Sequence, residues 1–336
     1  MSRSLLLRAP GRYLVTEAEP PAPGPGEALV RVAASGICGS DRELYDGTRP
    51  EPFRSYPIVP GHEWSGTVAA VGEGVDPGLA GAPVTGEGFR NCQVCDRCRD
   101  GDTNLCSAGY DETGFTRPGA FAEHLLLPAR LLHRLSPGAD LAAAALLEPA
   151  AVAAAAVLRA GVLPGERVAV VGAGTLGVLT VQLLAALSPA ELVAFDPRPS
   201  RASLATDSGA TALVPPASYS AGVDSARFDA VIETAGVPSS AADAVRLARR
   251  GGRVVLTGIP GTEPAGISPL AVVGGQLTVS GVFGASSRAW AHAVRAFNAG
   301  LLALRPLVTH ELGLTEFSRA LELLAEPATG KILLRP

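Results

Sequence analysis

Lysine is almost absent from this sequence. Of the 28 basic residues in a chain of 336, only Lys331 is lysine, and the other basic residues are arginine. We interpret this bias as codon usage in a GC-rich genome. An excess of positive charge is also lacking, because 28 basic and 32 acidic residues give a net charge of −4. Nucleic-acid binding needs a basic surface, so the composition argues against a nucleic-acid partner.

Cysteine is too scarce for a disulfide scaffold, since the chain has five and the number is odd. The first ten residues hold a run of only three leucines, too short for the apolar region of a signal peptide. The apolar stretch 141–163 contains Glu148, Pro149 and Arg159 and is mostly alanine. That composition predicts a buried or amphipathic helix rather than a membrane span. We therefore expect a cytoplasmic protein with no membrane partner.

The chain has two regions of different character. Its length suggests about two domains, at roughly 150 residues for each. The first ~140 residues are rich in glycine and proline and contain strand-like runs such as 27–33 and 65–71. From about residue 141, strand-like runs at 167–171, 191–195, 228–232 and 252–256 alternate with helical stretches. This alternation predicts an α/β fold with a doubly wound parallel sheet.

Four of the five cysteines are clustered. Cys92, Cys95, Cys98 and Cys106 are separated by two, two and seven residues. Four thiolates this close can enclose a tetrahedral ion, and zinc accepts four sulfur ligands without a redox role. Because all four positions would be filled by protein, we predict a structural zinc site. An iron–sulfur cluster and free or disulfide-paired thiols are the alternatives.

A glycine-rich motif follows a strand-like run in the second region. Gly172, Gly174 and Gly177 form the pattern G-x-G-x-x-G, and Thr175 and Leu176 begin a helical stretch. The first glycine allows a tight turn, the second lets the backbone approach a pyrophosphate, and the third allows close packing of helix on strand. The amide donors and the dipole of the helix N-terminus would then face the phosphates. The motif predicts a dinucleotide site.

The residue at the end of the next strand bears on which dinucleotide is bound. Asp196 lies 22 residues after Gly174, where a carboxylate can accept both hydroxyls of a ribose and would repel a 2′-phosphate. This favours NAD. Arg198 and Arg201 follow closely and are able to hold a phosphate, so NADP is the alternative.

The fifth cysteine lies near a histidine and a glutamate. Cys38 precedes His62 and Glu63 by about 24 residues. A thiolate, an imidazole and a carboxylate can form a zinc site that leaves a coordination position open. From spacing alone, the other interpretation is that Cys38 is a small buried residue and that His62 is a loop histidine with ordinary hydrogen bonds.

In this order, the motifs resemble those of zinc-dependent medium-chain dehydrogenases of the alcohol and polyol dehydrogenase superfamily. The resemblance is strongest to the branch of sorbitol and threonine dehydrogenases, and it covers nearly the whole chain. The motifs are CGSD at 38–41, PGHEWSG at 60–66, GAFAEH at 119–124, LEP at 147–149, VGAGTLG at 171–177, ETAG at 233–236, GGRVVLTG at 251–258 and the closing GKILLRP. A narrower similarity, through GFTRPGAFAEH at 114–124, is to aminocyclitol dehydrogenases of antibiotic biosynthesis.

The resemblance implies a metal-binding role for residues near both ends of the first region. Cys38 and His62 would bind a catalytic Zn²⁺, with Glu63 as a further ligand. Glu148 would be a ligand or lie beside the metal. Replacing the second thiolate of ethanol-type enzymes by a carboxylate suits an oxygen-rich substrate.

The resemblance also implies a path for the substrate proton. Ser40 would carry that proton, and Asp41 would steady the ligand histidine. Polyol dehydrogenases often have a histidine three residues after the serine, whereas this chain has Glu43. The proton would leave through Glu43 or through bulk water.

The resemblance predicts the following organisation. A GroES-like, mostly β catalytic domain would span 1–147, with a structural zinc lobe at about 90–107. A Rossmann domain would span 148–284, and 285–336 would return to the catalytic domain. By analogy we expect a homo-oligomer, a dimer or a tetramer.

The expected activity is hydride transfer between NAD and a secondary alcohol of a polyol, cyclitol or aminocyclitol. The expected cofactors are two zinc ions in each chain and NAD, with NADP as the alternative. A generic sugar-alcohol or threonine-like amino-alcohol dehydrogenase using NAD(P) is the alternative activity. A zinc-free quinone or enoyl reductase is a further rival, which the cysteine set argues against.

Overall fold

The computed structural model describes residues 1–216, 226–259 and 266–336. The chain divides into two compact units. Unit 1 comprises Met1–Glu148, Ser286–Val294 and Leu304–Pro336. Unit 2 comprises Pro149–Ala285 and Arg295–Ala303. The C-terminal segment therefore contributes to both units.

Unit 1 is mostly β. Its elements are β1 (Ser2–Ala9), β2 (Arg12–Ala18), β3 (Glu27–Ile37), α1 (Gly39–Asp46), β4 (Glu63–Val71), η1 (Pro77–Leu79), β5 (Pro83–Gly86), α2 (Asp96–Arg99), η2 (Thr103–Leu105), β6 (His124–Pro128), η3 (Ala129–Leu131), β7 (Leu132–Arg134), α3 (Leu141–Ala144), η5 (Arg305–Leu307), β14 (Val308–Gly313), η6 (Leu314–Glu316), α11 (Phe317–Leu323) and β15 (Lys331–Arg335). Helix α4 (Leu147–Ala160) begins in this unit and continues in unit 2, and α10 (Ser287–Asn298) is likewise shared.

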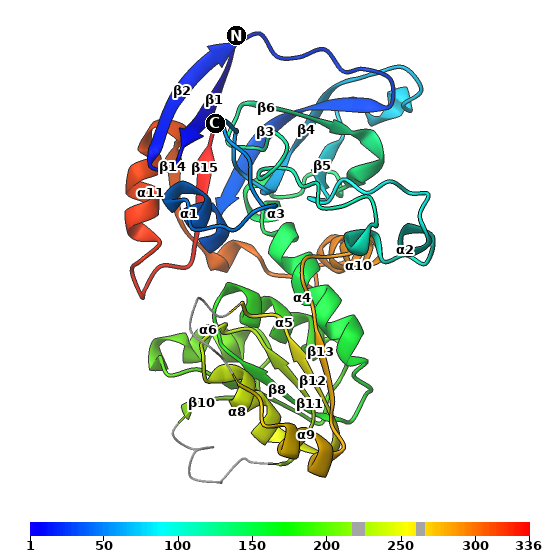
Figure 1. Cartoon of the computed structure of the whole chain (residues 1–336), viewed down its shortest axis with the longest axis vertical. Coiled ribbons are helices and arrows are strands. Elements are labelled where there is room, and N and C mark those ends of the chain that lie inside the picture. Colours follow the sequence, from blue (N-terminus) through cyan, green and yellow to red (C-terminus); the bar gives the residue numbers. More distant parts are fainter. Residues whose placement is uncertain (217–225, 260–265) are drawn as a thin grey trace. The chain divides into compact units, whose positions relative to one another are not determined.

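A seven-stranded sheet organises unit 1 (Figure 1). Its strand order is β14-β15-β3-β4-β5-β7, with β6 also paired to β3, and β1 and β2 form a separate antiparallel hairpin. Side chains alternate between the faces of each strand, and Trp64, Val30 and Leu125 are among the fully buried residues of one core cluster. The C-terminal strand β15 lies between β14 and β3 in this sheet and pairs antiparallel with β3.

Unit 2 is an α/β unit built on a parallel sheet. Its further elements are β8 (Arg167–Val171), α5 (Thr175–Ala185), β9 (Glu191–Phe195), η4 (Pro199–Arg201), α6 (Ala202–Asp207), β10 (Ala212–Val214), β11 (Phe228–Glu233), α8 (Ser240–Leu247), β12 (Ala248–Leu256), α9 (Pro269–Gly275) and β13 (Thr278–Gly281). Strand boundaries expected from the sequence at 167–171 and 191–195 agree with β8 and β9.

The six strands of this sheet have the order β10-β9-β8-β11-β12-β13. From β8 the chain adds β9 and then β10 on one side, and from β11 it adds β12 and then β13 on the other side. Because parallel crossovers are right-handed, α5 and α6 cover one face and α8 and α9 cover the other. The strand order reverses between β8 and β11, and ligands of such sheets bind at the carboxyl ends of the strands at this point. The predicted doubly wound sheet is confirmed.

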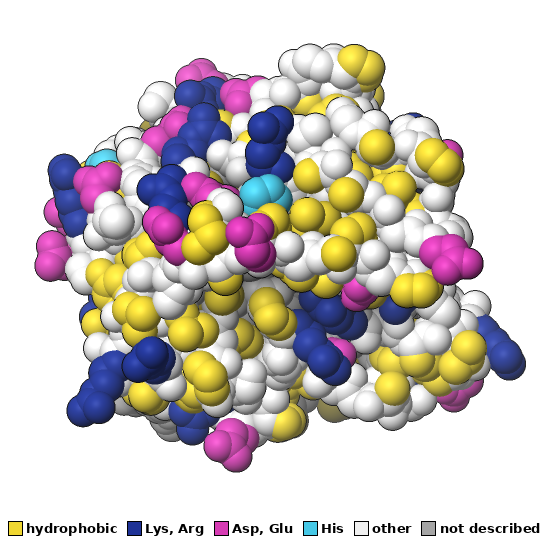
Figure 2. All heavy atoms as spheres, turned by 90° about the horizontal axis from the view of Figure 1, so that it is seen from above, with side chains coloured by type: hydrophobic (Ala, Val, Ile, Leu, Met, Phe, Trp, Pro, Cys, Tyr) yellow, Lys and Arg dark blue, Asp and Glu magenta, His cyan; other side chains and the backbone are white. Residues whose placement is uncertain are grey.

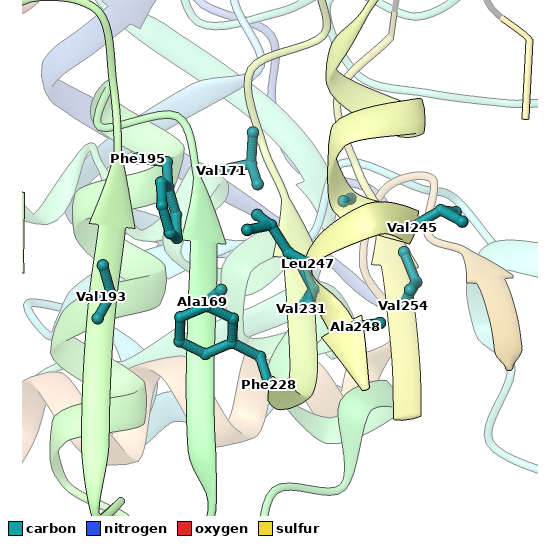
Figure 3. Close-up of a cluster of buried hydrophobic side chains, with 11 residues drawn as sticks. Ala169, Val171, Val193, Phe195, Phe228, Val231, Val245, Leu247, Ala248 and Val254 are labelled. Atoms are coloured by element: carbon teal, nitrogen blue, oxygen red, sulfur yellow. The ribbon is translucent and has the colours of Figure 1, made fainter. Parts of the chain in front are cut away.

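The core of unit 2 explains why its strands are almost continuously apolar. Side chains from β8, β9, β11 and α8 pack into one buried cluster (Figure 3). Within it, the rings of Phe195 and Phe228 meet edge to face, with centroids 5.8 Å apart. A strand that is covered on both faces has no side exposed to water, so its sequence does not alternate with polar residues.

The apolar stretch 141–163 forms two helical segments, α3 and α4, rather than one long helix. Within the described ranges, no helix is long and apolar enough to cross a membrane. On the molecular face drawn in Figure 2, cationic and anionic side chains are interspersed. Exposed pairs such as Arg42 with Asp46, at 2.6 Å, each contribute little stability because water screens them.

Candidate active site

Three neighbouring strands of unit 1 bring the candidate metal ligands together. In the register of β3 and β4, Gly36 lies opposite Glu63. In the register of β15 and β3, Ile332 lies opposite Ile37. Cys38 directly follows β3 and precedes α1. Strand pairing therefore places the end of β3, the start of β4 and the start of β15 side by side.

Cys38, His62 and Glu63 converge on one point. A ligand atom of each, the thiol sulfur, an imidazole nitrogen and a carboxylate oxygen, lies within 4.8 Å of the others. His62 and Glu63 are 4% and 1% exposed, and Cys38 is partly exposed. The sequence left open whether Cys38 and His62 were ordinary buried residues, and their convergence favours the metal-site interpretation.

The ring of His62 lies between two polar groups from α1. Ser40 Oγ is 3.5 Å from His62 Nε2, and Asp41 Oδ1 is 3.4 Å from His62 Nδ1. Asp41 Oδ2 accepts a hydrogen bond from the Cys38 amide at 2.9 Å, which fixes the carboxylate. Burial acts to lower the pKa of His62, but the charge of Asp41, together with hydrogen bonds to Asp41 and Cys38, raises that pKa well above its usual value.

Glu63 is held by a residue from the other end of the chain. Lys331 Nζ donates to Glu63 Oε1 at 2.6 Å and to the Ile37 carbonyl at 3.2 Å. The other oxygen, Oε2, faces Gly36, where an added Cβ would come within 2.2 Å of it. Burial acts to lower the pKa of Lys331, but the charges of Glu63 and Cys38 keep that pKa above its usual value.

Two further residues predicted for the site, Glu148 and Glu43, lie in different surroundings. Glu148, in the first turn of α4, is outside the group of converging ligand atoms. Burial raises its pKa to about 8, with the charge of His62 acting in the opposite direction and that of Glu63 adding to the rise. Its carboxyl group is therefore close to the site. The side chain of Glu43 is 53% exposed and lies 3.9 Å from Arg49 Nη1.

Sequence reasoning missed a buried polar cluster beside His62. Arg49 Nη2 donates to the Tyr110 hydroxyl at 2.9 Å, and that hydroxyl donates to Glu112 Oε2. The ring of Phe115 links the cluster to the site, since it lies 3.7 Å from the Arg49 guanidinium and 4.7 Å from the His62 ring. Burial raises the pKa of Glu112, although the charge of His62 acts to lower it. The only sign of this cluster in the sequence is the group of charged residues within 110–117.

The converging residues fit a zinc ion. Two buried polar atoms of these residues, His62 Nδ1 and Glu63 Oε2, and one of the neighbouring Asp41, Oδ1, have no hydrogen-bond partner within the described residues. Leaving such atoms unpaired costs free energy, and metal ligation with its supporting contacts would compensate that cost. The donor set of one sulfur, one nitrogen and carboxylate oxygen is a zinc set that leaves a coordination position for substrate.

The four clustered cysteines also converge, with their sulfur atoms within 4.8 Å of one another. Backbone amides support the sulfurs, because Cys95 N donates to Cys92 Sγ and Cys98 N to Cys95 Sγ, each at 3.4 Å. Hydrogen bonds from Ser107 lower the pKa of Cys95 to about 5, whereas burial raises that of Cys98 to about 12. A single cation among the sulfurs would allow all four to be thiolates, which fits a closed zinc site.

The glycine motif of unit 2 is required by close contacts. Gly172 has φ +98°, and a Cβ on it would lie 2.9 Å from the Ala235 amide nitrogen. A Cβ on Gly177 would lie 1.9 Å from the Gly172 carbonyl oxygen, so only glycine lets α5 approach β8. A Cβ on Gly174 would meet nothing within 4 Å. Thr175 and Leu176 begin α5, as predicted, with the amide groups of its first turn available to a ligand.

A cavity of about 430 Å³ begins at this loop and extends to the end of β9. Gly172 and Gly174 line one part of it, and Asp196 and Arg198 line another. It therefore lies at the carboxyl ends of the strands where the strand order reverses. Asp196 is 2% exposed, and its Oδ2 accepts from the Ala173 amide at 2.8 Å. Arg201 ends the short helix η4 that follows.

Two family profiles match this chain. The alcohol dehydrogenase GroES-like domain matches residues 24–137, and the zinc-binding dehydrogenase profile matches residues 175–299. An L-threonine 3-dehydrogenase of Deinococcus deserti is 32% identical over 330 residues, covering 95% of this chain and 94% of that protein.

Solved structures agree over the whole length. A zinc-binding dehydrogenase of Sinorhizobium meliloti bound to NADP is 30% identical, with a TM-score of 0.92, covering 100% of this chain and 99% of the other. Galactitol-1-phosphate dehydrogenase of Escherichia coli is 29% identical, with a TM-score of 0.88, covering 99% of this chain and 100% of the other. The protein is therefore a member of the zinc-binding, NAD(P)-dependent alcohol dehydrogenase family, with a GroES-like domain and a Rossmann domain.

Proposed function

We propose that this enzyme oxidises a secondary alcohol group of a polyol, cyclitol or aminocyclitol and transfers the hydride to a nicotinamide dinucleotide. The observation that carries the proposal is the convergence of Cys38, His62 and Glu63 within 4.8 Å. These residues would hold a zinc ion, which would supply Lewis acidity toward the substrate hydroxyl, and a bound nicotinamide dinucleotide would take up the hydride. The protein supplies position, charge and a route for the proton.

Ser40 would begin that route. Its hydroxyl can donate and accept at once, and it lies 3.5 Å from His62 Nε2. Glu43 follows three residues later on α1, one helical turn away, and its side chain reaches solvent. The substrate proton would pass to Ser40 and leave through Glu43 or bulk water. Asp41 holds the imidazole of His62 in orientation.

The charged groups of the site disfavour a phosphorylated substrate. Four carboxyl groups, those of Asp41, Glu63, Glu112 and Glu148, influence one another or His62 electrostatically. The cations that accompany them are Lys331 and Arg49. Lys331 is paired with Glu63 and Arg49 with Glu112, so neither cation is available to a phosphate, which disfavours a phosphorylated alcohol. An amino alcohol such as L-threonine is the second candidate, favoured by the 32% identical relative.

A substrate panel tests the proposal. We would follow reduced cofactor by absorbance with polyols, cyclitols, aminocyclitols, L-threonine and a sugar-alcohol phosphate, in the zinc-loaded enzyme. We expect turnover with an uncharged or amine-bearing secondary alcohol and little with the phosphate. Cys38→Ser should abolish turnover while dinucleotide binding persists. Cys106→Ser should remove the zinc ion of the four-cysteine cluster and leave Cys38, His62 and Glu63 unchanged. Full activity of Cys38→Ser on the best substrate would contradict the proposal.

We also propose that the chain forms a homo-oligomer. Leu270 and Val273 on α9 are 81% and 74% exposed. Strand β13, beside β12, is at the edge of the described part of the sheet in unit 2. Exposed apolar groups next to an unpaired strand edge favour association with a second copy.

A further inference from the structure

Glu233, the last residue of β11, carries a buried carboxylate that the proposed function does not use. The residue is 2% exposed. Its Oε1 accepts hydrogen bonds from the backbone amides of Ala235 and Gly236, at 2.7 and 2.8 Å. Its Oε2 accepts from the Gly258 amide at 3.1 Å. Hydrogen bonds from amides to a carboxylate are among the stronger ones in proteins, so this side chain fixes three points of the backbone.

The three amides belong to the turns that follow two neighbouring strands. Ala235 and Gly236 follow β11, and Gly258 follows β12. The main chains of the two turns are in close contact, because a Cβ on Gly258 would collide with the Gly236 amide nitrogen, and a Cβ on Gly236 would lie 3.0 Å from the Ile259 nitrogen. Gly236 also has φ +62°, which favours glycine. Glu233 therefore joins the two turns at a point where both require glycine.

The turn after β11 is also bound to the glycine motif. The Thr234 hydroxyl donates to the Val171 carbonyl at 2.9 Å, and the Gly172 carbonyl lies 3.1 Å from it. Thr234 and Ala235 line the same cavity as Gly172. Because β8, β11 and β12 are neighbours in the sheet, hydrogen bonds connect the glycine motif, the turn after β11 and the turn after β12 at one edge of the sheet.

The strand order indicates which half of a dinucleotide belongs with each turn. A doubly wound sheet of this order has two mononucleotide-binding halves, one on each side of the point where the strand order reverses. The adenosine half belongs with β8 and β9, because the carboxylate expected beside its ribose is that of Asp196, directly after β9. The nicotinamide half then belongs with β11 and β12, whose turns Glu233 joins.

We propose that Glu233 is a positioning residue for the cofactor, and that its carboxylate holds the turns after β11 and β12 in the arrangement that receives the nicotinamide half of the dinucleotide. It acts through the backbone amides that it binds. Two sequence motifs are then explained together, because ETAG at 233–236 begins with the acceptor and GGRVVLTG at 251–258 ends on the third donor. This inference rests on the proposed function, since it assumes that unit 2 binds the dinucleotide that accepts the hydride.

Binding of NADH and of ADP distinguishes positioning from a general loss of structure. ADP carries the adenosine half and the pyrophosphate, whereas NADH carries the nicotinamide half as well. Both lack a 2′-phosphate, so the comparison does not depend on whether NAD or NADP is the preferred cofactor. Nicotinamide fluorescence gives the dissociation constant of NADH for the zinc-loaded enzyme, and titration calorimetry gives that of ADP.

Glu233→Gln keeps the shape of the side chain but replaces one acceptor oxygen by an NH2 group. One of the two turns then faces a donor in place of an acceptor. We expect NADH to bind about tenfold more weakly and ADP to bind as before. Glu233→Asp keeps both oxygens on a shorter side chain, and its NADH affinity should lie between. The control is Glu191→Gln, which removes a negative charge at the first residue of β9, at the opposite end of the strands, and should change neither constant.

Gly258→Ala should reproduce the effect with the carboxylate intact. Its Cβ would lie 2.7 Å from Glu233 Oε2 and would collide with the Gly236 amide nitrogen, so the two turns must separate. The matched control is Gly274→Ala on α9, where a Cβ would meet nothing within 4 Å. The NADH affinity should fall in the first variant and not in the second, and the ADP affinity should fall in neither.

Two results would overturn the role of Glu233 and leave the dehydrogenase function intact. One is equal weakening of NADH and ADP in Glu233→Gln, with folding checked by circular dichroism, which would show a merely structural role. The other is NADH binding in that variant as tight as in the unmodified enzyme. If Glu233→Gln does not fold, Glu233→Asp and Gly258→Ala decide by the same comparison. Failure of the unmodified enzyme to bind either NADH or NADPH would overturn the proposed function together with this inference.

Discussion

Lys331 and Glu63 form a buried ion pair across 268 residues of sequence, with Nζ and Oε1 2.6 Å apart. Their side chains are 8% and 1% exposed. Because Glu63 belongs to the ligand group, the only lysine of the chain both compensates the carboxylate and fixes which oxygen remains available.

Removing the lysine charge should destabilise unit 1. Lys331→Met keeps the apolar stem and leaves Glu63 without a cation, and breaking a buried pair in this way typically costs about 3–5 kcal/mol. We expect that loss in urea unfolding of the metal-depleted protein, and a smaller loss after zinc is restored, because zinc compensates the same carboxylate. Lys331→Arg is the control and should lose less. A metal-depleted Lys331→Met protein as stable as the unmodified chain would contradict this account.

Gly36 should be essential for the position of the Glu63 carboxylate. A Cβ on Gly36 would come within 2.2 Å of Glu63 Oε2, whereas a Cβ on Gly39 would meet nothing within 4 Å. Gly36→Ala is therefore expected to weaken zinc binding at this site by about 10–100-fold, the usual effect of misplacing a ligand's support. Competition with a chromogenic chelator measures the affinity. Gly39→Ala should bind zinc normally, and equal affinities in the two variants would refute the argument.

Glu148 should make the metal-depleted protein less stable as pH rises. Burial raises its folded pKa to about 8, whereas an unfolded glutamate titrates near 4.3. Between those values the folded state holds a proton that the unfolded state has lost, so stability falls with increasing pH by up to about 1.4 kcal/mol per pH unit. Denaturant unfolding from pH 5 to pH 8 measures the slope.

Glu148→Gln is the matched variant for that slope, because the amide cannot ionise. His62, whose folded pKa is also raised, contributes a decline of the same sign above its unfolded pKa, and this part should remain. We expect the difference between the two proteins to grow steadily across the range. Parallel curves for the two proteins would show that Glu148 titrates normally.

The two zinc sites should empty independently. Cys98→Ser removes the most buried sulfur of the four-cysteine cluster and should lower zinc content from two ions per chain to one. The same variant should become sensitive to proteolysis within the zinc lobe, since the lobe has little other structure. Cys38→Ser should also lower the content to one ion, but without that sensitivity. Inductively coupled plasma mass spectrometry measures the number of zinc ions per chain. Loss of both ions from either variant would contradict the independence of the two sites.

Association of chains should depend on α9. Leu270→Glu together with Val273→Glu places two charges on the exposed apolar residues and should shift the protein to monomer in size-exclusion chromatography with light scattering. Leu163→Glu, at another exposed apolar position of unit 2 with 62% exposure, is the control. An oligomer unaffected by the double substitution would place the interface elsewhere.

Much of the fold was readable from local sequence. The runs at 167–171 and 191–195 predicted β8 and β9, and the alternation of strands and helices predicted the doubly wound sheet. Local patterns succeed here because the period of apolar residues reflects neighbours along the chain. The same reasoning expected one helix in 141–163, whereas the chain forms α3 and α4 separately. Alanine-rich sequence has no periodic signal that marks such a break.

The candidate site was only partly readable in this way. The four-cysteine cluster is compact in sequence, so spacing alone indicated a metal site. The convergence of Cys38 with His62 depends on the pairing of β3 and β4, which spacing cannot give. Glu112 and Tyr110 escaped notice because a charged residue in a glycine-rich loop usually lies in water, and only tertiary packing buried them beside His62.

The sequence by itself determined the protein's two-part construction, its cysteine cluster and its glycine loop, because each is encoded by residues that are neighbours in the chain. The tertiary structure decided which charges face one another. It placed Lys331 against Glu63 through the register of β15 on β3, and it turned Asp196 toward Arg198. Such pairings depend on strand register and side-chain direction, which composition and spacing do not record.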